Sequence, residues 1–118
     1  MTTEKTIHIL GKDVRLRYCA ATENGFEQLR KKSVYDIDFK SNEDLTALAL
    51  AAIIAAYARK DEEPPITSDE LLYDARPAEI IELVKTVIEL RAAWYEVPAV
   101  VLEEEQPKAD DEEDKPKN

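Results

Sequence analysis

Residues 45–58 read LTALALAAIIAAYA, an uncharged run in a chain whose residues are 36% charged. A helix that crosses a bilayer needs about 20 consecutive apolar residues, so this run is too short to be a membrane span. It must instead be buried in protein, which predicts a central helix. Its alanines would allow the backbones of neighbouring elements to come close.

This central helix is predicted to begin after Ser41 and to end near Arg59. Ser41 is followed three residues later by Asp44, which resembles the reciprocal capping pattern that starts a helix. The larger side chains recur at helical spacing and predict one broad buried face. That face consists of Leu45, Leu48, Ala49, Ala52, Ile53, Ala56 and Tyr57.

Two short strands are predicted near the N-terminus, because apolar and polar residues alternate between residues 6 and 19. A two-residue turn at Gly11-Lys12 would pair Ile9 with Val14, which brings the apolar sides of both strands together. An isolated hairpin is marginally stable in water, so we expect helices to cover its apolar face.

Two short helices and one long helix are predicted around these elements, and the short ones come first in the chain. Thr22 is the expected cap of a helix over residues 23–32, with Phe26 and Leu29 directed inward. The segment after it is expected to contribute Val34, Ile37 and Phe39 to the core. Pro64 and Pro65 then break the chain, and Thr67 or Ser68 caps a single turn through Leu71, Leu72 and Tyr73.

The longest predicted helix covers residues 77–96 and opens with Pro77, a favourable first helical residue. Its wide apolar face contains Ile80, Leu83, Val84, Val87, Ile88, Leu90 and Trp94. Its narrow polar stripe contains Glu79, Glu82, Lys85, Thr86 and Glu89. Since this apolar face is broader than one neighbouring helix requires, either the helix crosses the centre of the domain or part of it meets another molecule.

Charge divides the chain into two parts. Residues 103–118 contain eight acidic and three basic side chains, a net charge of −5, and the other 102 residues carry the remaining −5. We predict one globular domain over residues 1–102 and a disordered acidic tail over residues 103–118, whose removal leaves the melting temperature almost unchanged. The predicted fold is mainly α with a small N-terminal β-hairpin (α+β), the hairpin being packed on a bundle of about four helices.

Composition also bounds the partners and the compartment. The acidic chain has no basic stripe, which disfavours nucleic acid as a direct ligand and an anionic membrane surface as a binding site. Its single cysteine, Cys19, cannot form an internal disulfide and is interpreted as a small buried hydrophobe. The N-terminal residues lack the apolar segment of a secretory signal, so we expect a cytoplasmic location.

No residue set in the sequence predicts catalysis, a cofactor or a metal site. The single histidine, His8, would lie opposite Arg15 on the exposed face of the hairpin and has no partners to tune it. The acidic stretch DIDFKSNED places Lys40 at the third ligand position of a calcium loop, and there is no cysteine and histidine cluster for zinc. We therefore predict a protein that is not an enzyme.

An interaction site is predicted instead near the end of the last helix. Trp94 and Tyr95 precede Pro98, and aromatic residues are enriched at binding hot spots, although ordinary core packing explains Trp94 equally well. The predicted partner-binding residues are Val84, Val87, Ile88, Arg91, Trp94 and Tyr95.

The order of these elements resembles a known family. The hairpin TIHILGKDVRLRY is followed by a short helix, the helical run DLTALALAAIIAAYA, a proline-bearing loop, the turn ITSDELLYD and the helix PAEIIELVKTVIEL. This order, over roughly residues 5 to 97, is similar to that of the tail assembly chaperones of long-tailed bacteriophages and prophages. The family is defined by pattern and element order rather than by catalytic residues.

The resemblance implies a non-catalytic chaperone that binds the tape measure protein and assists assembly of tail tube subunits around it. Such a protein acts in the cytoplasm of the bacterial host and is absent from the mature virion. The tail tube protein is a second expected partner, and self-association remains open. The alternative from charge alone is an acidic inhibitor or antitoxin-like adaptor for a basic protein, whose binding would weaken steeply with salt.

Overall fold

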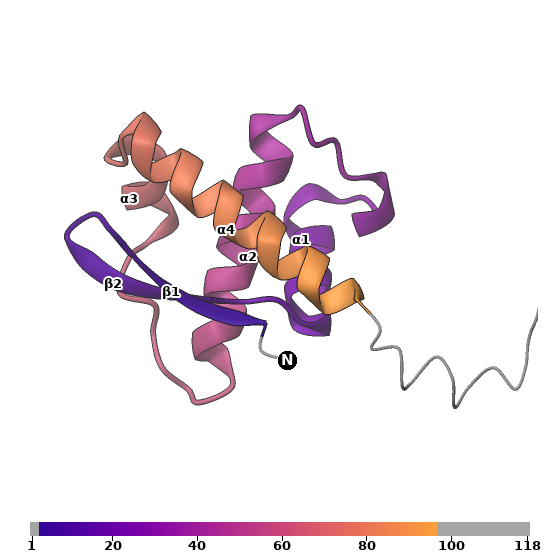
Figure 1. Ribbon diagram of the computed structural model, residues 1–118, viewed down its shortest axis with the longest axis horizontal. Coiled ribbons are helices and arrows are strands. Elements are labelled where there is room, and N and C mark those ends of the chain that lie inside the picture. The colour runs from indigo at the N-terminus through magenta and orange to yellow at the C-terminus, as the bar shows by residue number, and fades with distance from the viewer. Residues whose placement is uncertain (1–2, 97–118) are drawn as a thin grey trace, which may run out of the picture.

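The computed structural model describes residues 3–96 and has an α+β fold that is mainly helical (Figure 1). Its elements, in chain order, are β1 (Glu4–Ile9), β2 (Lys12–Arg17), α1 (Ala20–Arg30), the 3-10 turn η1 (Val34–Asp36), α2 (Asn42–Ala58), α3 (Ser68–Tyr73) and α4 (Pro77–Tyr95). This confirms the predicted hairpin packed on about four helices. The predicted domain end at residue 102 and the acidic tail over residues 103–118 lie outside the described residues.

The predicted central helix is confirmed as α2, which packs against α1, β2 and α4 (Figure 1). Its burial is wider than the single predicted face, because Ala51 and Ala55 on the other side are also buried. Small side chains make this possible. A Cβ atom at Gly25 in α1 would lie only 3.2 Å from the Cβ atom of Ala51, so the missing side chain at Gly25 allows α1 to approach α2 closely there.

The hairpin register differs from the predicted one by two residues. Ile7 pairs with Val14 and Ile9 with Lys12, so the turn residues are Leu10 and Gly11 rather than Gly11 and Lys12. Both turn residues have positive φ, 53° and 72°, as a type I′ turn requires. Because side chains alternate with period two, a shift of two residues leaves the same apolar side facing the helices.

The start of α1 corrects the prediction for Thr22. The helix begins at Ala20 with Cys19 as its cap, and Cys19 is partly rather than fully buried. Thr22 lies within the first turn, where its buried hydroxyl donates to the carbonyl of Arg17 at 2.6 Å and accepts from the backbone N–H of Cys19 at 3.2 Å. Thr22 therefore joins α1 to the end of β2.

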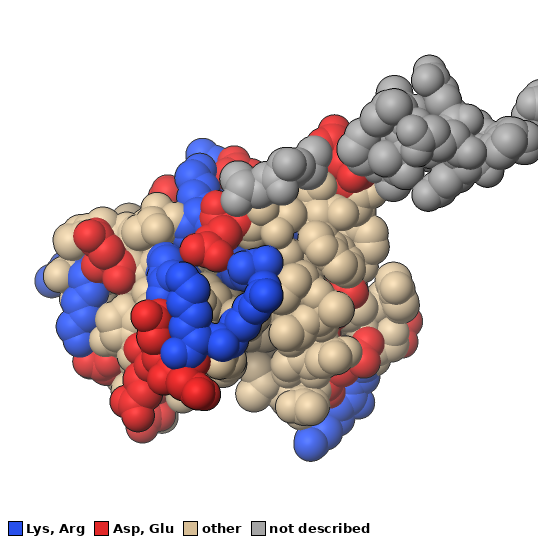
Figure 2. Space-filling view, turned by 90° about the horizontal axis from the view of Figure 1, so that it is seen from below, with Lys and Arg blue, Asp and Glu red and all other residues tan. Residues whose placement is uncertain are grey.

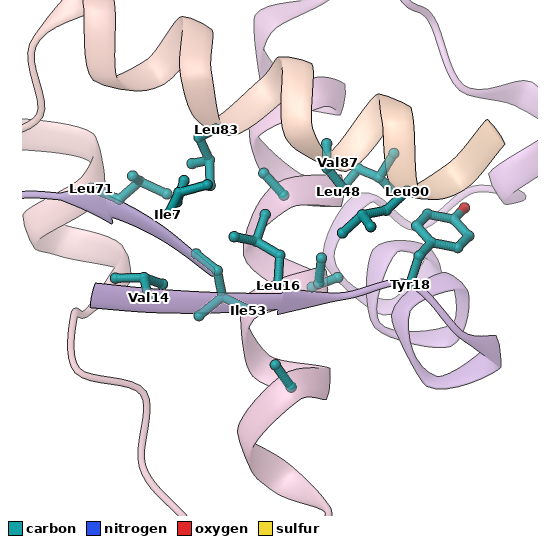
Figure 3. Packing of buried hydrophobic residues seen from close by; sticks show 14 of the residues in the cluster. Ile7, Val14, Leu16, Tyr18, Leu48, Ile53, Leu71, Leu83, Val87 and Leu90 are labelled. Carbon is teal, nitrogen blue, oxygen red and sulfur yellow. The ribbon is translucent and has the colours of Figure 1, made fainter. Parts of the chain in front are cut away.

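The core unites the hairpin with all four helices (Figure 3). Phe26 and Val34 are buried as predicted, whereas Leu29 and Phe39 are nearly half exposed and were wrongly assigned to the core. Thr86 was wrongly placed on the polar stripe of α4. Thr86 is buried, and its hydroxyl donates to the carbonyl of Glu82 at 2.8 Å. The hydroxyl therefore has a hydrogen-bond partner within its own helix.

The start of α2 is fixed by a buried carboxylate. Ser41 caps the helix as predicted by accepting from the backbone N–H of Asp44, but the Asp44 side chain does not return to Ser41. It contacts Lys32 Nζ at 2.6 Å and accepts from Arg30 Nε and the backbone N–H of Asp38, both at 2.8 Å. These hydrogen bonds, that to Lys32 first, lower the pKa of Asp44 to about 2.

Candidate interaction surface

A shallow apolar groove lies between α4 and the first turns of α2. We call it the α4 groove, and its volume is about 410 Å³. It is lined by Asn42, Leu45, Ile80, Ile81, Val84, Lys85, Ile88 and Glu89. Ile81 is its most exposed apolar side chain, at 66%, and Ile88 is 37% exposed. Side chains at this helical spacing present a stripe that a second helix can cover.

A second hollow adjoins the α4 groove and shares Asn42 and Ile80 with it. This α3 groove has a volume of about 440 Å³ and lies between α1, α2 and α3. It is lined by Leu29, Arg30, Asn42, Glu43, Thr46, Ala47, Leu50, Ser68, Leu71, Leu72 and Ile80. The two hollows therefore meet at the first turn of α2, and the α3 groove has polar as well as apolar residues in its lining.

The six residues predicted to bind a partner divide into three groups. Val84 and Ile88 line the α4 groove, whereas Val87 is fully buried in the core and offers no exposed surface. Arg91, Trp94 and Tyr95 lie beyond the groove, at the C-terminal end of α4. Leu45, Ile80 and Ile81 line the groove but were not among the predicted site residues. Ile80 and Ile81 are apolar residues close to Val84 in the sequence, but the arrangement of α2 and α4 decides which apolar side chains remain exposed.

An aromatic cluster at the end of α4 contains Tyr18, Trp94 and Tyr95. The ring of buried Tyr18 lies 5.5 Å from that of Trp94, and Trp94 meets Tyr95 edge-to-face at 5.1 Å between ring centroids. Trp94 is still 36% exposed, so it both packs on the core and presents surface. The hydroxyls of Tyr18 and Tyr95 both donate to Oε2 of Glu23. Burial first, and then Glu23, raise the pKa of both tyrosines.

Arg91 occupies an unusual position beside this cluster. Its guanidinium carbon lies 5.0 Å from the ring centroid of Tyr95 and 5.2 Å from that of Phe39. Within residues 3–96, Arg91 has no ion-pair partner, and its Nε atom is buried without a hydrogen bond. Contact with two aromatic faces stabilises a guanidinium without satisfying its N–H donors.

The polar groups buried within the fold are used for structure. Thr22, Asp44 and Thr86 each hydrogen-bond to neighbouring backbone or side chains. His8 lies on the exposed face as expected, but opposite Asp13 instead of Arg15, with Nδ1 2.9 Å from Oδ1. In the part of the chain that the structure describes, no group of three or more His, Cys, Asp or Glu residues is placed to hold a metal ion.

Charged side chains are mixed rather than segregated on the face drawn in Figure 2. Lys and Arg lie next to Asp and Glu over one half of that face, and uncharged residues cover most of the other half. Among residues 3–96, Arg15 pairs with Glu62, and Arg17 approaches Glu4 at 3.7 Å. Across residues 3–96, no helix has the length and apolar character that crossing a bilayer requires.

Comparison with known proteins gives no match: neither a family model, nor a curated protein, nor a solved structure is significantly similar to this chain.

Proposed function

We propose that this protein is a non-catalytic tail assembly chaperone of a phage or prophage, which binds apolar helices of the tape measure protein and assists assembly of the tail tube. The proposal rests on the resemblance in element order and on one structural observation, the α4 groove. An open apolar groove between two helices suits a helical client better than it suits a compact substrate.

The shape and lining of the α4 groove support a helix as the bound element. Amphipathic helices dock by placing apolar side chains at positions i, i+3, i+4 and i+7 into such grooves. From Ile80 to Glu89, the part of α4 that lines the groove extends for about 14 Å at 1.5 Å per residue, which matches two to three turns of a client helix. Covering Ile81 and Ile88 would remove apolar surface from water on both partners.

The acidic inhibitor remains the competing function, and salt separates the two. An inhibitor held by carboxylates would lose affinity for a basic protein as ionic strength rises. Residues 3–96 contain 18 acidic and 13 basic side chains, and several of these form ion pairs with one another. This mixture favours apolar contact as the main source of affinity.

The test uses a helical fragment of the tape measure protein encoded in the same phage or prophage genome. Light scattering would follow aggregation of this fragment with and without the chaperone at low and high salt. We expect the wild-type protein to suppress scattering at both salt concentrations and Ile81→Asp to abolish suppression. Tyr73→Asp is the matched control, because Tyr73 is 83% exposed and lines neither groove. Equal suppression by Ile81→Asp, or none by the wild type, would reject the proposal.

A further inference from the structure

Among the four partly buried arginines of residues 3–96, Arg91 differs from the other three. Arg15 pairs with Glu62, Arg17 lies 3.7 Å from Glu4, and Arg30 donates to Asp44 at 2.8 Å. Arg91 has two aromatic rings beside it and, among residues 3–96, no ion-pair partner. Partly buried guanidinium groups are normally paired, because their N–H donors lose water on burial. Arg91 is therefore left without a carboxylate among residues 3–96 and is available to bind one.

We infer that Arg91 binds a carboxylate of the client helix, so that the α4 groove selects amphipathic helices with an Asp or Glu close to the end of their apolar stripe. This inference rests on the proposed function and names the chemistry of the client. Arg91 would be a specificity-determining residue at one end of an apolar docking surface.

The position of Arg91 on α4 supports this role. Residues 80, 84, 88, 91 and 95 follow one another at intervals of four, four, three and four, so they form a single stripe along the helix. Arg91 is therefore one turn beyond Ile88, the last apolar residue that lines the α4 groove. A client helix that covers this stripe would bring the side chain following its last apolar anchor next to the guanidinium.

The aromatic contacts prepare Arg91 for a carboxylate. Stacking against the rings of Phe39 and Tyr95 restricts the long side chain, so less conformational entropy is lost when a partner binds. Nε is enclosed, and the guanidinium is left to use its terminal nitrogens. A planar guanidinium can donate two parallel hydrogen bonds to a carboxylate. Both rings are nearly half exposed, so this end of the stripe lies at the surface.

The charges along the groove favour an acidic client. Lys85 lines the groove and has no ion-pair partner among the described residues, whereas Glu89 on the same rim is within 3.8 Å of Lys5. Cations that lack partners thus lie on both sides of Ile88 in a domain with more acidic than basic residues. A second copy of this chain would present the same two cations in its own stripe, whereas a client helix with carboxylates presents the complementary charge. This complementarity favours a client helix over a second copy.

The test is a binding cycle with synthetic helical peptides. Fluorescein-labelled peptides of 21 residues would carry leucines at helical spacing, with one Glu placed in turn at each position of the last two turns, and a reference peptide would carry Gln throughout. Anisotropy would give their affinities for wild-type protein and for Arg91→Met, which retains much of the apolar stem. We expect the best Glu peptide to bind the wild type at least about fivefold more tightly than the Gln peptide, and both to bind Arg91→Met equally.

Two further variants control this cycle. Arg59→Met removes an exposed arginine that lines neither groove, and it should leave the preference for Glu intact. Arg91→Lys retains the charge without the planar donors and should keep only part of the preference, which distinguishes recognition by Arg91 from a disturbance of the aromatic cluster.

The outcomes separate the two proposals. Equal binding of the Glu and Gln peptides to the wild type would overturn the role of Arg91 and leave the proposed function standing. Failure of every peptide to bind would overturn both, because the groove would then not accept an apolar helix. An Arg91-dependent dimer in sedimentation velocity, with no peptide binding, would identify a second copy as the occupant and would also overturn the inference.

Discussion

The backbone N–H of Leu10 donates a 2.6 Å hydrogen bond to Oε2 of Glu79, which lies 69 residues further along the chain. Oε1 of the same carboxylate accepts from the backbone N–H of Arg76 at 2.8 Å, at the start of α4. One side chain thereby joins the hairpin turn to the helix that forms the groove. The hydrogen bond from Arg76 and then that from Leu10 lower the pKa of Glu79.

Replacing this carboxylate is predicted to loosen the hairpin tip. Glu79→Ala leaves two backbone N–H groups without their acceptor, so we expect the melting temperature to fall by several degrees and exchange of the Leu10 amide to accelerate. Glu82→Ala, at an exposed position of the same helix, should change neither quantity. Slow exchange of the Leu10 amide in Glu79→Ala would show that the turn does not depend on this contact.

Asp44 is predicted to govern stability in acid. Its pKa is about 2 in the folded protein against an ordinary value of 3.8. Folding therefore stabilises the ionised form of this carboxyl group. The resulting stabilisation is fully present above about pH 4 and is lost as the pH falls towards 2. Melting temperatures measured between pH 7 and pH 2 should therefore decline mainly in this window.

The variant Asp44→Asn tests this assignment. It leaves Arg30 and Lys32 without their shared anion, and we expect it to cost about 2 kcal/mol at pH 7, because both cations retain partial access to water. Its stability should also change less between pH 4 and pH 2 than that of the wild type. Glu43→Gln, at an exposed position that contacts Arg30 at 3.4 Å, is the control and should behave like the wild type. An unchanged acid profile in Asp44→Asn would assign the transition to other carboxylates.

Local sequence patterns predicted most of the secondary structure for identifiable reasons. Pro77 and Thr67 start their helices by rules that act within a few residues, and the structure places α4 and α3 accordingly. The hairpin register was wrong because alternation with period two is unchanged by a shift of two residues. Leu10 in the turn also donates to Glu79, a contact across 69 residues that no local pattern encodes.

The candidate site was less predictable for a related reason. Val87 and Ile88 are adjacent apolar residues on one helix, yet the first is buried and the second lines the groove. Helical periodicity predicts that both belong to a wide apolar face, but it does not indicate which of these residues α2 buries. The same limit applies to Asp44, whose capping position is local while its partners Arg30 and Lys32 come from α1 and the loop after it.

Gly25→Ala tests the close packing of α1 on α2. Alanine is the better helix former by about 1 kcal/mol, but its Cβ would lie 3.2 Å from that of Ala51. We expect overpacking to exceed the gain in helix propensity and the variant to lose about 1 kcal/mol, because Asp44 and Phe26 hold the two helices together. Chemical denaturation would measure this loss, and the double variant Gly25→Ala, Ala51→Gly should relieve the crowding. A rise in stability for Gly25→Ala alone would show that the helices can separate without cost.

Ile53 and Ile54 are consecutive residues of α2 with opposite environments, which makes them a matched pair for testing the centre of the fold. Ile53 has no exposed surface, whereas Ile54 is 45% exposed. Ile53→Asp would bury a carboxylate without a cation, and the cost of several kcal/mol is comparable with the whole stability of a small domain. We expect Ile53→Asp to lose its helical circular dichroism and cooperative melting.

Ile54→Asp, with the same change of side chain, should keep both properties, because its carboxylate can reach water. If Ile53→Asp melted cooperatively within a few degrees of the wild type, α2 would not be the centre of the core. The arrangement of α4 against it, and with it the α4 groove, would then be wrong as well.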